Sequence, residues 1–68
     1  MKSGDVVFWK PNGSYSISKN GKPRRYGVFD VRRKYATIES EELYNKGLTS
    51  QKINVLISEL EPIIEEAN

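Results

Sequence analysis

Residues 24–40, RRYGVFDVRRKYATIES, hold two runs of alternating apolar and polar residues on either side of a basic triplet. Alternation with period two, in segments rich in β-branched and aromatic side chains, is typical of β-strands. The triplet Arg32, Arg33 and Lys34 would then form the tight turn between two antiparallel strands. This stretch therefore predicts a β-hairpin, and the other segments are expected to cover one of its faces.

The alternation also assigns the two faces of the expected hairpin. The inward face is expected to carry the apolar residues Phe29, Val31, Ala36 and Ile38. The outward face is expected to carry Tyr26, Val28, Asp30, Arg32, Tyr35, Thr37 and Glu39. Gly27 is in phase with the inward set, where a missing side chain permits a close backbone approach or a sharp bend.

The segments before the hairpin are expected to form one strand and one irregular excursion. The run VVFWK, which begins at Val6, has strand composition, with either its odd or its even positions in the core. Residues 11–23 contain two Asn-Gly dipeptides around the alternating run SYSIS. Because Asn-Gly favours the positive φ angles of tight turns, we expect a short strand between two turns or an ordered excursion.

The C-terminal part of the sequence fits two different periods. With period two it forms a strand whose buried side carries Ile53, Val55 and Ile57, a tight turn at SELEP, and a final short strand with Ile63 and Ile64. With period 3.6 it forms an apolar helical stripe, which would give an α+β fold: an antiparallel sheet with a C-terminal helix or helix-turn-helix. Pro62 favours the strands, because proline inside a helix costs roughly 3 kcal/mol. Residues 41–50 are expected to form a loop or a single helical turn that ends at Gly47.

Length and composition bound the fold and exclude most catalytic chemistry. The 68 residues allow one small globular domain, residues 1–68, and the absence of cysteine and histidine removes the commonest general base and metal ligands. Glu39, Glu41 and Glu42 are expected on a solvated face rather than in an acid/base or metal cluster. We therefore expect no enzyme activity, cofactor, metal or small-molecule substrate. Because the longest apolar run has four residues, we expect no membrane segment, and the absence of cysteine leaves a cytoplasmic protein as the expectation.

Four segments of the chain resemble an SH3-like β-barrel of the KOW and small accessory-subunit type. GDVVFWK is similar to the first strand of such barrels, RRYGVFDV with KYATIES to the central pair, and INVLISELEPI to the last strands with their 3₁₀ turn. The resemblance implies a mainly β fold, a small barrel of about five antiparallel strands with a short helical turn. It also implies binding of RNA, DNA or a protein partner rather than catalysis.

Charge is divided unevenly along the chain. Residues 1–36 carry nine Lys and Arg against two Asp, whereas residues 37–68 carry two Lys against seven Glu. Either the two halves attract each other in the fold, or the basic half meets an acidic partner, such as nucleic acid or an acidic protein surface.

Basic and aromatic residues occur together near both ends of the first hairpin strand. The candidate binding residues are Lys22, Arg24, Arg25, Tyr26, Arg32, Arg33, Lys34 and Tyr35, with Trp9 as a further stacking candidate. Arginine makes bidentate contacts with phosphate, and tyrosine stacks on unpaired bases. We expect a small non-enzymatic module that binds nucleic acid through this hairpin. The alternatives are a protein-interaction or accessory subunit of phage or plasmid type that uses the same surface, and a solvated edge with a structural role. The sequence does not indicate the oligomeric state.

Overall fold

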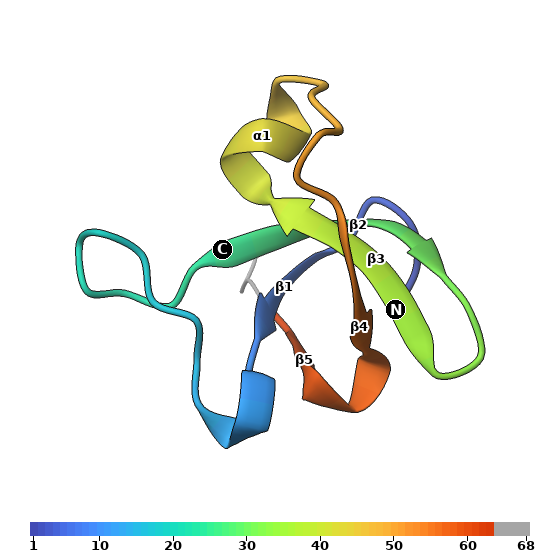
Figure 1. The fold of residues 1–68 in the computed structure, drawn as a ribbon, viewed down its shortest axis with the longest axis horizontal. Coiled ribbons are helices and arrows are strands. Elements are labelled where there is room, and N and C mark those ends of the chain that lie inside the picture. Colours follow the sequence, from blue (N-terminus) through green and yellow to red (C-terminus); the bar gives the residue numbers. More distant parts are fainter. Residues whose placement is uncertain (64–68) are drawn as a thin grey trace, which may run out of the picture.

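The computed structural model describes residues 1–63 and contains one five-stranded antiparallel sheet (Figure 1). Its strands are β1 (Val6–Trp9), β2 (Arg25–Val31), β3 (Tyr35–Ser40), β4 (Ile53–Leu56) and β5 (Leu60–Pro62). Its helical segments are the 3₁₀ turn η1 (Pro11–Gly13), the short helix α1 (Glu41–Asn45) and the 3₁₀ turn η2 (Ile57–Glu59). The predicted mainly β fold, with five antiparallel strands and a short helical turn, is confirmed.

The strand order is β4-β3-β2-β1-β5, so β4 and β5 are the two edges of the sheet. The sheet curls, and β1, β4 and β5 cross the β2–β3 hairpin at a steep angle (Figure 1). Although η2 connects the two edge strands in the sequence, they do not pair, and the sheet is not closed into a barrel.

The strand interpretation of the C-terminal part is confirmed and the helical alternative is wrong. Pro62 lies in the edge strand β5 opposite Val7, a position where the missing N–H can face away from the sheet. The details differ from the expectation, because the turn η2 begins at Ile57 and the last strand begins at Leu60. In addition, Ile53, which was expected on the buried side, is 38% exposed. Ile64, which was also expected in that strand, lies outside the described residues.

The core lies on the inner face of the sheet and draws on all five strands. It consists of Val7, Tyr26, Val28, Ala36, Ile38, Val55 and Leu60, with Trp9, Val31 and Ile57 packed against it. The predicted inward positions in β3 are therefore confirmed, and β1 contributes its odd positions. The ring of Trp9 contacts that of Tyr26 edge to face, with 5.8 Å between the ring centroids.

The first half of β2 has the opposite phase from the one expected. Tyr26 and Val28 are buried, at 7% and 0% exposure, so the prediction that they point outward is wrong. A register shift between Val28 and Asp30 marks a β-bulge against β3. The bulge inserts one residue and thereby exchanges the two faces of the strand. Beyond it Val31 packs against the core as expected, whereas Phe29 contacts residues outside the core.

The connection between β1 and β2 is an ordered excursion held by turns. Asn12 and Gly13 have φ angles of 56° and 84°, and Gly21 has a φ of 80°, as expected for the two Asn-Gly dipeptides. The segment between them forms only an isolated bridge, from Ile17 to Pro23, rather than a full strand. The excursion projects away from the sheet in Figure 1.

The short helix α1 covers one end of the outer face of the hairpin. Its Tyr44 ring lies 4.8 Å from the ring of Phe29 and so close to Gly27 that no Cβ would fit there. Glu39 is fully buried, its Oε2 accepts a hydrogen bond from the Gln51 backbone N–H at 3.0 Å, and its Oε1 has no partner among residues 1–63. The prediction that Glu39 is solvated is wrong, because α1 and the loop after it cover this outward position.

The expected helical turn is present as α1, but it ends at Asn45 with Lys46 as its C-cap, and Gly47 is the left-handed residue that follows. Gly47 has a φ of 73° and donates its N–H to the Tyr44 carbonyl, while Leu48 donates to the Leu43 carbonyl, both at 3.1 Å. These two bonds form a Schellman motif, which satisfies carbonyls at the helix end and favours glycine at the left-handed position.

Candidate nucleic-acid interface

The tip of the β2–β3 hairpin carries the basic triplet on a fixed backbone. The Arg32 N–H donates to the Tyr35 carbonyl at 2.7 Å, which closes the turn, and the Ile57 N–H donates to the Lys34 carbonyl at 2.8 Å. Arg32 also pairs with Asp30, with 3.0 Å between Nε and Oδ2. No ion pair within residues 1–63 involves Arg33 or Lys34, and both are exposed. Two cations at the tip are therefore available for an anionic partner.

Among residues 1–63, Tyr35 is the most exposed large apolar side chain, at 53% exposure. It stands opposite Leu56 of β4, which is 40% exposed, and cross-strand partners share a face of the sheet. Thr37 and Asn54 form the next pair on that face, and the Thr37 hydroxyl donates to Asn54 Oδ1 at 2.6 Å. Together with Arg32, three of these residues line a shallow hollow beside the tip: Tyr35, Thr37 and Asn54. We call the residues Arg32, Arg33, Lys34, Tyr35, Thr37 and Asn54 together the tip surface.

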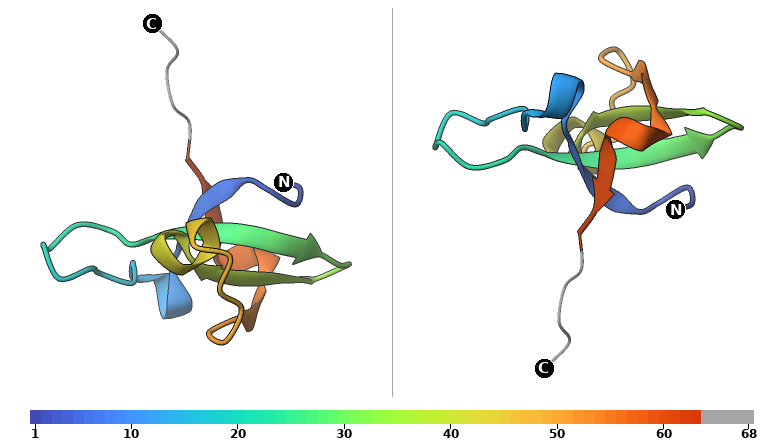
Figure 2. Two further views of the ribbon diagram at one scale, coloured as in Figure 1. Left: turned by 90° about the horizontal axis from the view of Figure 1, so that it is seen from above. Right: turned by 90° about the horizontal axis from the view of Figure 1, so that it is seen from below.

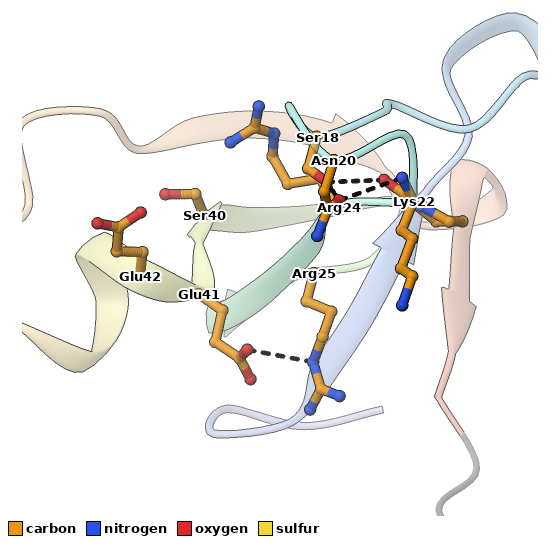
Figure 3. Close-up of a pocket in the computed structure, with 9 residues that line it drawn as sticks. Ser18, Asn20, Lys22, Arg24, Arg25, Ser40, Glu41 and Glu42 are labelled. Atoms are coloured by element: carbon orange, nitrogen blue, oxygen red, sulfur yellow. Dashed lines mark hydrogen bonds and ion pairs between the residues drawn. The ribbon is translucent and has the colours of Figure 1, made fainter.

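The second predicted basic group lies at the other end of β2. Lys22, Arg24 and Arg25 line a hollow together with Ser18, Asn20, Pro23, Ser40, Glu41 and Glu42 (Figure 3). Arg25 Nε lies 3.1 Å from Glu41 Oε1, and Figure 3 shows this pair between the start of β2 and the start of α1. Because two glutamates share the hollow with the three cations, its charge is mixed rather than strongly positive.

The structure does not bring the two basic groups together. The excursion that carries Lys22 and the tip that carries Arg33 project from opposite sides of the molecule in both views of Figure 2. The seven residues of β2 separate them by about 20 Å. The tip surface is thus a site of its own.

The two remaining candidates, Tyr26 and Trp9, belong to the interior. The Tyr26 hydroxyl lies 2.9 Å from Ser16 Oγ, and its ring is in the core. Trp9 is partly buried and donates its Nε1–H to Glu59 Oε1 at 3.4 Å. Tyr26 therefore offers no exposed ring face for stacking, contrary to the sequence-based assignment, and Trp9 mainly supports the core.

Sequence reasoning identified Arg32, Arg33, Lys34 and Tyr35 but missed the partners supplied by β4. From the sequence alone, Asn54 is a candidate contact only on the exposed face of the alternative helix, and Leu56 is only a member of its apolar stripe. Their position beside Tyr35 depends on the β3–β4 register. The one available signal was the alternation in β3, which places Thr37 on the same face as Tyr35.

Within residues 1–63, Asp30 is the acidic residue that forms an ion pair with a residue of the tip. Glu59 and Glu61 are near β1 and the excursion, where Glu61 accepts a hydrogen bond from the Tyr15 hydroxyl. This hydrogen bond, followed by desolvation and the negative charge of Glu61, raises the pKa of Tyr15 above its usual value of 10.0. Within residues 1–63 no three Asp or Glu side chains are grouped to hold a metal ion.

Among the same residues, no helix has the length and apolar character needed to cross a lipid bilayer. The comparisons with protein-family models, curated proteins and solved structures give no match for this chain.

Proposed function

We propose that this protein is a small, non-enzymatic, cytoplasmic module that binds single-stranded nucleic acid through the tip surface. One observation carries the proposal: Tyr35, more than half exposed, stands directly beside Arg33 and Lys34, which have no carboxylate partner in the described chain. We also propose a relationship to SH3-like domains of the KOW type. Because many such domains bind RNA or DNA, this relationship favours the proposed function by analogy.

The chemistry of the tip surface suits a flexible polyanion. Arg33 and Lys34 would neutralise neighbouring phosphates, and the exposed face of Tyr35 would stack on an unpaired base. A duplex keeps its bases stacked inside, so that an isolated surface tyrosine could not reach a base face. Single strands are therefore the preferred ligand.

Fluorescence anisotropy with a labelled single-stranded oligonucleotide of mixed sequence tests the proposal. In the Arg33→Ala/Lys34→Ala variant, the slope of log affinity against log salt should become shallower by about 1.4, since each lost phosphate contact accounts for about 0.7. The Lys19→Ala/Lys46→Ala variant loses the same net charge on the excursion and just after α1, away from the tip (Figure 2), and its slope should stay close to that of the wild type.

The contribution of stacking is tested separately at Tyr35. Tyr35→Ala should weaken binding at least fivefold, because stacking on one base is worth about 1–3 kcal/mol. Tyr35→Phe keeps the ring and should bind as the wild type does. Absence of binding by the wild type at low salt, or equal losses in the tip and control variants, would contradict the proposed function.

Binding of an acidic, extended peptide is the second candidate function, and it is favoured by the free edge of β4. In the described part of the chain, this strand has no partner on one side, and its Ile53 and Leu56 are 38% and 40% exposed. An extended peptide can add to such an edge, and the tip cations would attract an acidic one. Titration of the ¹⁵N-labelled protein with an alternating Glu-Val peptide should shift the β4 amide signals, and unshifted signals at millimolar peptide would exclude this function.

A further inference from the structure

The hollow beside the tip combines a stacking surface with an oriented amide. Tyr35 and Asn54 are diagonal neighbours across the β3–β4 pair, since Tyr35 faces Leu56 and Thr37 faces Asn54. Diagonal neighbours lie roughly 7–8 Å apart, so one planar ligand can reach both side chains. Arg32 is the fourth residue that lines the hollow, and its Nε lies 3.0 Å from Asp30 Oδ2.

The Thr37 hydroxyl fixes which end of the Asn54 amide is available to a ligand. It donates to Asn54 Oδ1 at 2.6 Å, so Oδ1 keeps one lone pair and Nδ2 keeps both of its hydrogens. No hydrogen bond to Nδ2 occurs among the described residues. The amide therefore presents a donor and an acceptor side by side at an exposed position of β4.

We infer that this hollow is a base-binding subsite that selects adenine. Nδ2–H would donate to N7 of the base, and Oδ1 would accept from the N6 amino group, the bidentate pairing by which asparagine reads adenine. The Tyr35 ring would stack on the same base, and Arg32 would contact the adjoining phosphate. Guanine presents two acceptors, O6 and N7, on the same edge, so its O6 would face the acceptor Oδ1 without a hydrogen bond. The pyrimidines have no N7 and cannot form the bidentate pair.

The inference rests on the proposed function, and the experiment separates the two. Affinities are measured for labelled ten-nucleotide strands of deoxyadenosine, deoxycytidine and thymidine at one low salt concentration. The adenine strand should bind at least about fivefold more tightly than the others, since a bidentate contact is worth about 1–3 kcal/mol. A strand of 7-deaza-deoxyadenosine keeps the stacking surface and N6 but lacks N7, and should lose most of this advantage.

Variants then assign the selectivity to the hollow. Asn54→Ala should bind the three strands with similar affinities while retaining the steep salt dependence that the tip cations provide. Thr37→Val removes the hydroxyl that orients the amide and should reduce the preference. Asn45→Ala removes an exposed asparagine of α1 and should leave the preference unchanged.

The outcomes distinguish the two proposals. Equal affinities of the wild type for all three strands, or full retention of the preference by the 7-deaza strand or by Asn54→Ala, would overturn adenine selection and leave nucleic-acid binding intact. Absence of binding to every strand at low salt would overturn both.

Discussion

Replacing Gly27 with alanine is expected to displace α1 from the hairpin. A Cβ at Gly27 would lie 2.4 Å from Cγ and Cδ2 of Tyr44 and 2.8 Å from its Cδ1. Carbon atoms in contact prefer separations of about 3.5–4.0 Å, so the ring would have to retreat by about 1 Å or more. Gly27 does not have a positive φ, and its backbone can accept alanine without strain. The steric effect is therefore confined to the Tyr44 ring.

The expected magnitude follows from two opposing contributions. Overpacking of this kind costs about 1–3 kcal/mol, whereas alanine is better than glycine inside a strand by about 0.5–1 kcal/mol. Gly27→Ala should thus lower the free energy of unfolding by about 1–2 kcal/mol in the wild type, a fall in Tm of roughly 5–15 °C for a domain of this size. In a Tyr44→Ala background the clash is absent, and the same change should raise the free energy of unfolding by about 0.5–1 kcal/mol.

Urea unfolding of the four proteins in this double-mutant cycle measures the coupling between the two residues. We expect a coupling energy of about 1.5–3 kcal/mol. Tyr44→Phe is the matched control, because it keeps the ring and should preserve the full cost of Gly27→Ala. A change of the same size and sign in the wild-type and Tyr44→Ala backgrounds would refute close packing of α1 on Gly27.

Three further predictions concern single contacts. Glu39→Gln keeps an acceptor for the Gln51 N–H and removes an ionisable group from a fully buried position, so urea unfolding should show a gain of about 1 kcal/mol. A loss of stability would instead indicate a cation that stabilises the carboxylate. Gly47→Ala forces a side chain into φ 73° and should cost about 1 kcal/mol in the same assay, with a smaller loss for Gly47→Asn. Tyr15 should titrate above 10.0 in an absorbance titration and return toward 10.0 in Glu61→Gln. Because folding raises this pKa, the associated stability is present below pH 10 and is lost as the pH rises through the raised value.

Sequence-based predictions were correct where a feature depends on residues close together in the sequence, and wrong where it depends on a bulge or on tertiary contacts. The strand β3 has no bulge, so simple alternation placed Ala36 and Ile38 correctly. In β2 the bulge near Phe29 reversed the faces, and nothing in the local composition marks an inserted residue. The burial of Glu39 depends on where α1 returns over the sheet, which is a tertiary property.

The same distinction applies to the candidate site. Arg33, Lys34 and Tyr35 are at the turn of a hairpin, so their exposure follows from a local pattern. Asn54 reaches Thr37 only because a connection of twelve residues, 41–52, sets the β3–β4 register. The alternation of apolar and polar residues within one strand does not determine the register of that strand with its neighbour.

One end of the outer face of the hairpin contributes to stability and the other end to the proposed binding, and variants can test the two roles separately. Its covered end holds Gly27 beneath the Tyr44 ring, and its open end holds Tyr35 beside the tip. Because the open end makes no contact with α1 in the hydrogen bonds and ring contacts described, displacement of the helix should leave it unchanged. Gly27→Ala should therefore lower stability but bind oligonucleotides with the wild-type affinity at temperatures where it is folded. Tyr35→Ala should show the opposite behaviour, with weakened binding and a Tm close to that of the wild type. If the two variants lost affinity in parallel, the tip surface would not be independent of α1, and the separation of the two ends would be wrong.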